Sequence, residues 1–309
     1  MSRIRTDLAL ESSALQNATG ALAGVSMSQA QYGDVMETVV EILDERGAAL
    51  LGRSVGRYVT LASVDLPRND IETREVVVSR LRETITSMIP DCGDVLVVGL
   101  GNRRITADSL GPKVVDRVIV TRHMRDQTPD GLKGRLRSVS AVAPGVLGVT
   151  GMETAEVVRG IVEHVKPCAV IAIDALAARE TQRICTTLQI ADTGIDPGSG
   201  IGNHRMALNK ETLGVPVVAL GVPMVVYAAT IARDALSLLA QDLGFDCEEH
   251  AKALDALVER VVAEQLGDMV VTPREVDERV ANIAEAIALG INGALQPRLT
   301  DDEIPTLMH

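Results

Sequence analysis

Apolar and polar residues alternate along the chain in blocks that predict buried strands and amphipathic helices. Runs rich in Val, Ile, Leu and Ala, typical of strands buried on both faces, occupy residues 56–64, 95–100, 139–143, 169–173, 184–191 and 215–220. Apolar residues recur at helical spacing over residues 70–89, 110–125, 150–165, 224–243, 248–266 and 272–289. This alternation predicts one α/β domain with a mixed, mostly parallel sheet and helices on both faces.

Local signals place the start of two helices and the extent of an N-terminal arm. The segments Thr150-Gly-Met-Glu153 and Thr272-Pro-Arg-Glu275 match the capping box, which predicts a helix beginning at each. The first residues are rich in Ser, Ala, Gly and Gln and show weak periodicity. They predict a loosely held arm, which we extend over residues 8–55.

Composition narrows the classes of partner. The chain has 309 residues, of which 46% are hydrophobic, enough for a substantial core, and its formal net charge is −12. Three Tyr, one Phe and no Trp leave no base-stacking platform, and acidic surfaces repel phosphates, so we expect no direct binding of nucleic acid. The segment 215–232 comes nearest to a membrane span, but its Pro and Gly residues favour a strand, a turn and a helix.

Targeting and cysteine signals favour a reducing compartment. The N-terminus has no apolar core of a secretory signal, and no C-x-x-C pair is present among the four cysteines. We therefore expect a cytoplasmic protein that does not enter the membrane.

Two apolar runs lead into a lone aspartate, Asp108 after VLVVGLGNRRITA and Asp174 after AVIAI. Open α/β sheets place their chemistry at the carboxyl ends of parallel strands. Two carboxylates held close there cannot both ionise readily, so one can take a proton from water while the other donates one. The alternative for each is a helix-cap or turn aspartate, and the sequence leaves the choice open.

Other motifs near these aspartates are incomplete. Gly99-Leu-Gly101 has Arg104 where a dinucleotide fingerprint needs glycine, so no nucleotide cofactor is expected and the glycines suit a tight turn. Asp192-Thr-Gly194 spells the pepsin tripeptide, but in an α/β chain it favours a structural turn.

Nucleophile and metal motifs are also weak. Ser199 lacks the G-x-S-x-G context of a nucleophile elbow. The five histidines show no short metal-ligand spacing, so we expect no metal, although a site assembled from distant residues stays open.

Longer blocks resemble one family. RTDLALE, GRYVTL, TADSLGP, APGVLGVTGMET, IAIDALAAR, IADTGIDPGSGIGN and MVVTPREVD follow one another from Arg5 toward Gln296 in the order seen in the germination proteases (spore proteases) of endospore-forming bacteria. The resemblance implies an endopeptidase that starts the degradation of small acid-soluble spore proteins during germination. It also implies a fold like that of hydrogenase-maturation peptidases, a homotetramer, a location in the forespore or spore core, and an inactive precursor that cuts itself.

The resemblance assigns roles to particular residues. It implies that Asp108 and Asp174 are the catalytic pair, and that the Asp7–Leu8 bond is the propeptide site, with residues 1–7 removed from a peptidase domain of residues 8–309. The chain departs from many members at Ala107, where they have Pro, and at Asp196, where they have His.

The segment Thr6–Glu11 also looks like the acidic-apolar motif that the family cuts in its substrates. A chain carrying a copy of that motif can occupy its own cleft. Substrate carboxylates need partners, and Arg103, Arg104 and Arg179 lie close in sequence to the two aspartates, so we expect some of them to bind these carboxylates.

Overall fold

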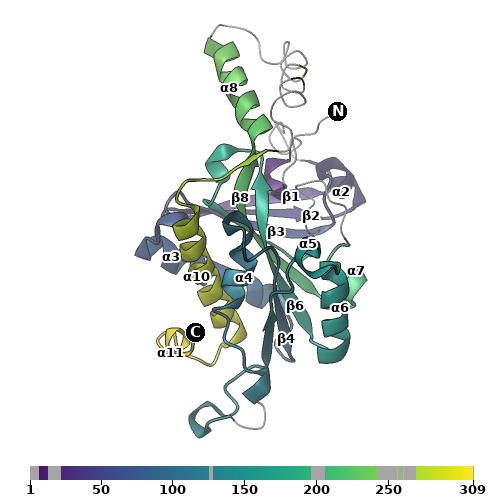
Figure 1. Ribbon diagram of the computed structural model, residues 1–309, viewed down its shortest axis with the longest axis vertical. Helices are drawn as coiled ribbons and strands as arrows, with labels where there is room; N and C mark the ends of the chain where they lie inside the picture. The colour runs from purple at the N-terminus through teal and green to yellow at the C-terminus, as the bar shows by residue number, and fades with distance from the viewer. Residues whose placement is uncertain are drawn as a thin grey trace.

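A computed structural model describes residues 7–12, 22–124, 128–195, 206–242, 256, 260 and 269–308. Its centre is a nine-stranded mixed sheet in the order β1-β2-β3-β7-β8-β6-β4-β5, with β9 paired to β8 (Figure 1). The strands are β1 Val25–Tyr32, β2 Val35–Ile42, β3 Gly56–Ala62, β4 Val95–Gly99, β5 Val139–Val142, β6 Ala169–Ala178, β7 Thr187–Ala191, β8 Val217–Tyr227 and β9 Val270–Val271.

Parallel and antiparallel pairing divide the sheet into two halves. The pairs β6–β8, β4–β6 and β4–β5 are parallel. The pairs β1–β2, β2–β3, β3–β7, β7–β8 and β8–β9 are antiparallel. The mixed sheet is as predicted, but parallel pairing is confined to one half, because the N-terminal strands add an antiparallel extension.

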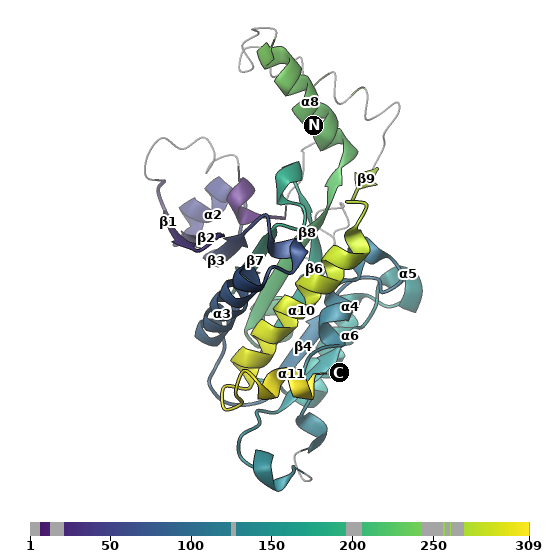
Figure 2. The same ribbon diagram turned by 90° about the vertical axis from the view of Figure 1, so that its left-hand side faces the viewer.

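Helices cover both faces of the parallel half, as the alternating pattern predicts. In Figure 2, α3, α4 and α10 lie along one face, and their apolar side chains share one core with the sheet. Helix α6 packs its Ala155, Val158 and Val162 on the opposite face. The helices are α2 Glu45–Leu51, α3 Ile71–Met88, α4 Leu110–Val115, α5 Leu147–Thr150, α6 Thr154–Val165, α7 Lys210–Leu213, α8 Ala228–Asp242, α10 Val276–Leu295 and α11 Glu303–Leu307.

Much of the predicted N-terminal arm is regular structure. Residues 25–42 form the hairpin β1–β2, β2 pairs with β3, and Asp44 caps α2 by accepting hydrogen bonds from two backbone amides. The prediction of a loose arm over residues 8–55 does not hold for residues 25–51. Strand β1 faces solvent along most of its length, which explains why its sequence lacks an apolar pattern.

Both predicted capping boxes are displaced. Helix α6 begins at Thr154 and α10 at Val276, so each N-cap lies three residues later than its capping box predicts. Thr150 is the last residue of α5, and its hydroxyl donates to Val146 O at the start of that helix and accepts from Met152 N. The hydroxyl of Thr272 donates to Met224 O of β8. Each threonine thus belongs to the structure that precedes its predicted helix.

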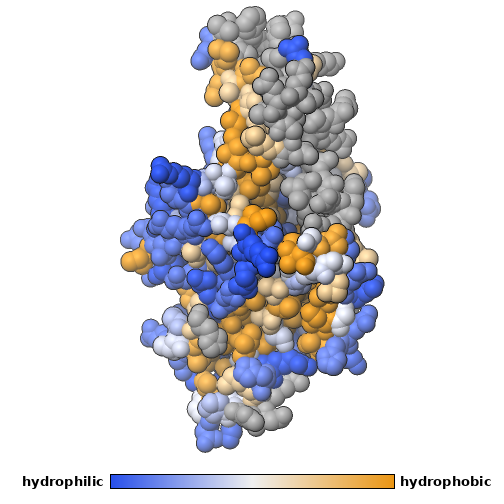
Figure 3. Space-filling model, in the orientation of Figure 1, coloured by the Kyte–Doolittle hydropathy of each residue, from blue (hydrophilic) through white to orange (hydrophobic). Residues whose placement is uncertain are grey.

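Helix α8 projects beyond the sheet and exposes apolar side chains. Ile231, Leu238 and Leu239 are exposed along it, and Figure 3 shows the apolar surface continuing from α8 toward the sheet. No helix among the described residues is long and apolar enough to cross a membrane. The predicted helix 248–266, apart from residues 256 and 260, and the positions Asp196 and Ser199 lie outside the described residues.

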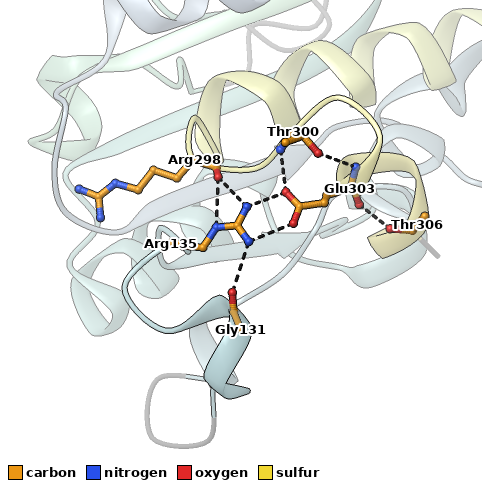
Figure 4. A network of polar contacts seen from close by, with 6 residues as sticks. All are labelled: Gly131, Arg135, Arg298, Thr300, Glu303 and Thr306. Atoms are coloured by element: carbon orange, nitrogen blue, oxygen red, sulfur yellow. Dashed lines mark hydrogen bonds and ion pairs between the residues drawn. The ribbon is translucent and has the colours of Figure 1, made fainter.

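Arg135 forms an ion pair with the C-terminal helix α11, whose Ile304 also packs in a small apolar cluster. Arg135 donates from Nη1 to Glu303 Oε1 over 3.0 Å and from Nη2 to Glu303 Oε2 over 2.6 Å, and its Nη2 also contacts Arg298 O (Figure 4). Thr300 N donates to the same carboxylate. The arginine beside it lowers the pKa of Glu303 to about 2.

This pairing predicts a pH-dependent contribution to stability. The pKa of Glu303 is lower in the folded chain than the ordinary 4.5, so the contribution is present above about pH 4.5 and is lost as pH falls toward about 2. We expect Glu303→Gln to lower the melting temperature slightly at neutral pH, because the pair is partly exposed. Melting curves from pH 7 to 2 should show this difference disappear in acid.

Glu163→Gln, which removes an exposed carboxylate of α6 away from this network, is the control. A Glu303→Gln difference that stays constant down to pH 2 contradicts the assignment.

Candidate active site

The parallel half of the sheet has a point where the chain changes direction. From β4 the chain crosses through α4 to β5 on one side, then returns through α6 to β6 on the other side. Where the chain leaves two neighbouring parallel strands toward opposite sides of the sheet, a crevice opens at the carboxyl ends of those strands. Here the crevice lies after Gly99 of β4 and Ile173 of β6, which are paired.

Asp108 lies at the end of the loop that follows β4, in the 3-10 turn Thr106–Asp108. The loop turns at Gly101, whose φ of 107° is strained for other residues, and a Cβ there would lie 2.1 Å from Asp108 O. Asp108 Oδ2 accepts from Asn102 N over 2.7 Å. The carboxylate therefore closes its own loop, which is the turn role, while it also faces the crevice.

Asp174 follows directly on the last residue of β6 that pairs with β4. The sequence predicts a strand ending at Ile173, but β6 continues to Ala178 because it stays paired with β8. Asp174 is therefore within a strand, and only 8% of its surface is exposed. Its Oδ1 accepts from Ala175 N over 2.9 Å.

Both aspartates line one cleft of about 830 Å³. Leu100 N donates to Ile173 O, so the residues leading to the two aspartates are hydrogen-bonded to each other. The 3-10 turn that carries Asp108 also packs against β6. The structure thus brings together the two residues that the sequence could only place at strand ends.

The N-terminal segment 7–12 borders the same cleft through Asp7, which is one of the lining residues. Asp7 N donates to Ala177 O over 3.2 Å, and Ala177 N donates to Asp7 Oδ2 over 2.9 Å. The next residue, Leu8, is 1% exposed. Figure 2 shows the segment that follows, Ala9–Glu11, beside α2.

Glu11 is the most strongly held residue of this segment. Its carboxylate is fully buried and accepts from Arg179 N and Glu180 N, each over 2.9 Å. Arg183 Nε lies 3.3 Å from Glu11 Oε1. Two backbone donors and a guanidinium offset the cost of burying a carboxylate. These three groups form a pocket around Glu11 that favours a carboxylate side chain.

The three arginines predicted to bind substrate carboxylates differ from one another in what they contact. The guanidinium of Arg103 pairs with Asp116, and Arg104 is exposed. Arg179 contacts Glu11 through its backbone N–H. Two further residues at the arm carry no signal in the sequence: Arg183 lies on a 3-10 turn with no motif, and Gln189 lines the cleft from β7.

The remaining motifs have structural partners. Asp192 Oδ1 accepts from Arg57 N at the start of β3, so the contact of this aspartate is structural, but it joins two strands and does not close the turn that was predicted for the Asp-Thr-Gly segment. Within the described ranges, no three His, Cys, Asp or Glu side chains are grouped so that they could hold a metal ion.

Comparison with known proteins now identifies the family. A family model described as germination protease matches residues 5–262. The chain belongs to the germination protease family. A germination protease of Caldanaerobacter subterraneus is 44% identical, with 99% of this chain and 98% of the relative covered. Those of Clostridium perfringens strain SM101 and Bacillus subtilis are 41% and 35% identical, also over nearly their whole lengths.

Membership of the germination protease family makes the chain a protease with a role in spore germination. Among solved structures, a [NiFe] hydrogenase maturation protease from Thermococcus kodakarensis covers 66% of this germination protease, and 96% of its own chain is covered. Its TM-score is 0.34 at 18% identity.

Proposed function

We propose that this germination protease is an aspartate-dependent endopeptidase that begins the degradation of small acid-soluble spore proteins and is made as a self-cutting precursor. One observation carries the proposal. Residues 7–12, called the arm below, belong to the segment that looks like the substrate motif, and Asp7 lines the cleft that Asp108 and Asp174 also line. A peptidase precursor that cuts itself requires such an arm at its own site.

The chemistry follows from the two carboxylates. One aspartate, ionised, takes a proton from a water molecule, whose oxygen attacks the carbonyl carbon of the bond to be cut. The other, protonated, gives its proton to the leaving amine as the C–N bond breaks. At the Asp7–Leu8 bond the products are a new carboxyl group on Asp7 and a new amine on Leu8, with one water consumed.

Precursor inhibition has a physical basis in the same contacts. The segment 7–12 is bound through backbone hydrogen bonds and through Glu11, so a substrate must displace it to enter. We propose that removal of residues 1–7 makes this displacement easier, because it deletes Asp7 and its bonds to Ala177.

The assembly and location are further parts of the proposal. We propose a homotetramer in the forespore or spore core that acts on small spore proteins without binding DNA itself. The exposed apolar side chains of α8 support contact between copies. Light scattering of the purified protein measures the number of copies.

The decisive test incubates the purified protein with a small acid-soluble spore protein and identifies the products by mass spectrometry. We expect cuts after an acidic residue and before a large apolar one, as at Asp7–Leu8. An intact substrate that co-purifies with the chain favours a non-catalytic binder. Cleavage that a chelator stops and added metal restores favours a metal-dependent peptidase.

The contacts of Glu11 predict how a substitution at Arg183 changes the protection of the arm. We expect Arg183→Gln to expose the arm to an added chymotrypsin-like protease about 10- to 100-fold faster, because it removes the guanidinium that forms an ion pair with the buried Glu11 carboxylate. The assay measures cleavage after Leu8 and Leu10 in chains that also carry Asp174→Asn, which we expect to be unable to cut themselves.

Arg103→Gln is the matched control, because Arg103 pairs with Asp116 and not with the arm. Equal protection of the arm in both variants excludes Arg183 as the residue that holds Glu11.

A further inference from the structure

Gln189 lies in register with Asp174 across three strands. Gln189 of β7 pairs with Gly221 of β8, and Gly221 pairs with Asp174 of β6. Paired residues present their side chains on the same face of a sheet. Adjacent strands are about 4.8 Å apart, so Gln189 and Asp174 begin about 10 Å apart with a glycine between them. All three residues line the cleft.

The side-chain amide of Gln189 contacts the arm at two points. Its Nε2 donates to Asp7 O over 3.2 Å, and its Oε1 accepts from Ala9 N over 2.6 Å. The partners fix the orientation of the amide, because a carbonyl oxygen only accepts and a backbone N–H only donates. Gln189 is 9% exposed, and its bond to Ala9 N is buried while its bond to Asp7 O is partly buried.

The oxygen that Gln189 contacts belongs to the carbonyl of the Asp7–Leu8 bond. We propose that Gln189 is a catalytic residue that binds the carbonyl oxygen of the bond to be cut and stabilises the negative charge that develops on it. This role rests on the proposed function, since it assumes that the bond beside Gln189 is the one that is cleaved.

The step balances without any further reactant. As the water oxygen attacks, the electron pair of the C=O double bond moves onto the oxygen, where the Nε2–H of Gln189 meets it. The pair returns when the C–N bond breaks, and Leu8 leaves as an amine that has taken a proton from the protonated aspartate. A donor already in place in a poorly hydrated site stabilises this charge more in the transition state than in the bound arm.

Gln189→Glu separates this role from simple binding of the arm. Glutamate has nearly the same shape and can still accept from Ala9 N, but when ionised it has no proton to donate to Asp7 O. At neutral pH we expect self-cleavage to be about 10²- to 10³-fold slower than in the wild type, as for loss of one oxyanion donor. As pH falls and the new carboxyl group takes up a proton, it becomes a donor and the deficit should narrow.

The experiment follows the first-order rate of self-cleavage by intact mass from pH 7.5 to 5, with the new N-terminus identified in each chain. Gln182→Glu, which makes the same change at an exposed position on the neighbouring 3-10 turn, is the control and should cut itself at the wild-type rate. Protection of the arm from added protease is measured in parallel, and thermal melting confirms folding.

The possible results divide clearly. A Gln189→Glu chain that keeps the arm protected, cuts itself slowly and recovers in acid supports the proposal. A rate within about threefold of the wild type overturns it, as does a rate that falls only in proportion to lost arm protection. Wild-type cleavage at another bond also overturns it. A wild-type chain that cuts neither itself nor a small spore protein contradicts the proposed function as well.

Discussion

Asp108→Asn and Asp174→Asn should each abolish both self-cleavage and the cleavage of small spore proteins while leaving the fold intact. Asparagine neither takes up nor releases a proton at these pH values, and one positioned acid or base contributes about 10²- to 10⁴-fold to a rate. The fold should survive, because an asparagine oxygen can still accept the hydrogen bonds from Asn102 N and Ala175 N.

The rates are measured by intact mass for the arm and by product analysis for an added spore protein. Asp116→Asn, which changes an exposed carboxylate paired with Arg103, is the control and should stay active. Wild-type activity in either purified active-site variant contradicts the catalytic pair.

Gly99→Ala should destabilise the protein and slow it at the same time. A Cβ on Gly99 would lie 2.3 Å from Gly111 O, so β4 and α4 cannot keep their present approach. Overpacking of this kind costs about 1–3 kcal/mol, and each kcal/mol lowers the melting temperature by about 2–4 °C in a domain of this size. Because β4 leads into the loop that carries Asp108, we also expect slower self-cleavage.

Gly131→Ala is the matched control, since a Cβ there would meet nothing within 4 Å. Thermal melting and self-cleavage are measured on both variants. A Gly99→Ala chain as stable and active as Gly131→Ala excludes this close packing.

The parallel half of the fold could be predicted because its strands are buried on both faces. Val95–Gly99 and Ala169–Ile173 are continuous apolar runs, and the first residue of each strand was predicted correctly, whereas β6 continues to Ala178. The hairpin β1–β2 could not be predicted, because β1 is mostly solvent-facing. Neither its composition nor its periodicity therefore carries the apolar pattern of a buried strand.

The candidate site also could be predicted only where its residues had a local signal in the sequence. Strand-end position and family resemblance pointed to Asp108 and Asp174, and the structure places both in one cleft. Arg183 and Gln189 had no such signal. Each contacts the arm, about 170 to 180 residues away in the chain, and contacts over such separations leave no local pattern.

The most direct test of the account is the intact-mass time course of the purified full-length chain, with the new N-terminus identified. We expect one product that begins at Leu8 and forms at a rate independent of protein concentration, because Asp7 lines the cleft of its own chain. Cleavage at a different bond, or the same cleavage in the Asp174→Asn chain, would contradict the account.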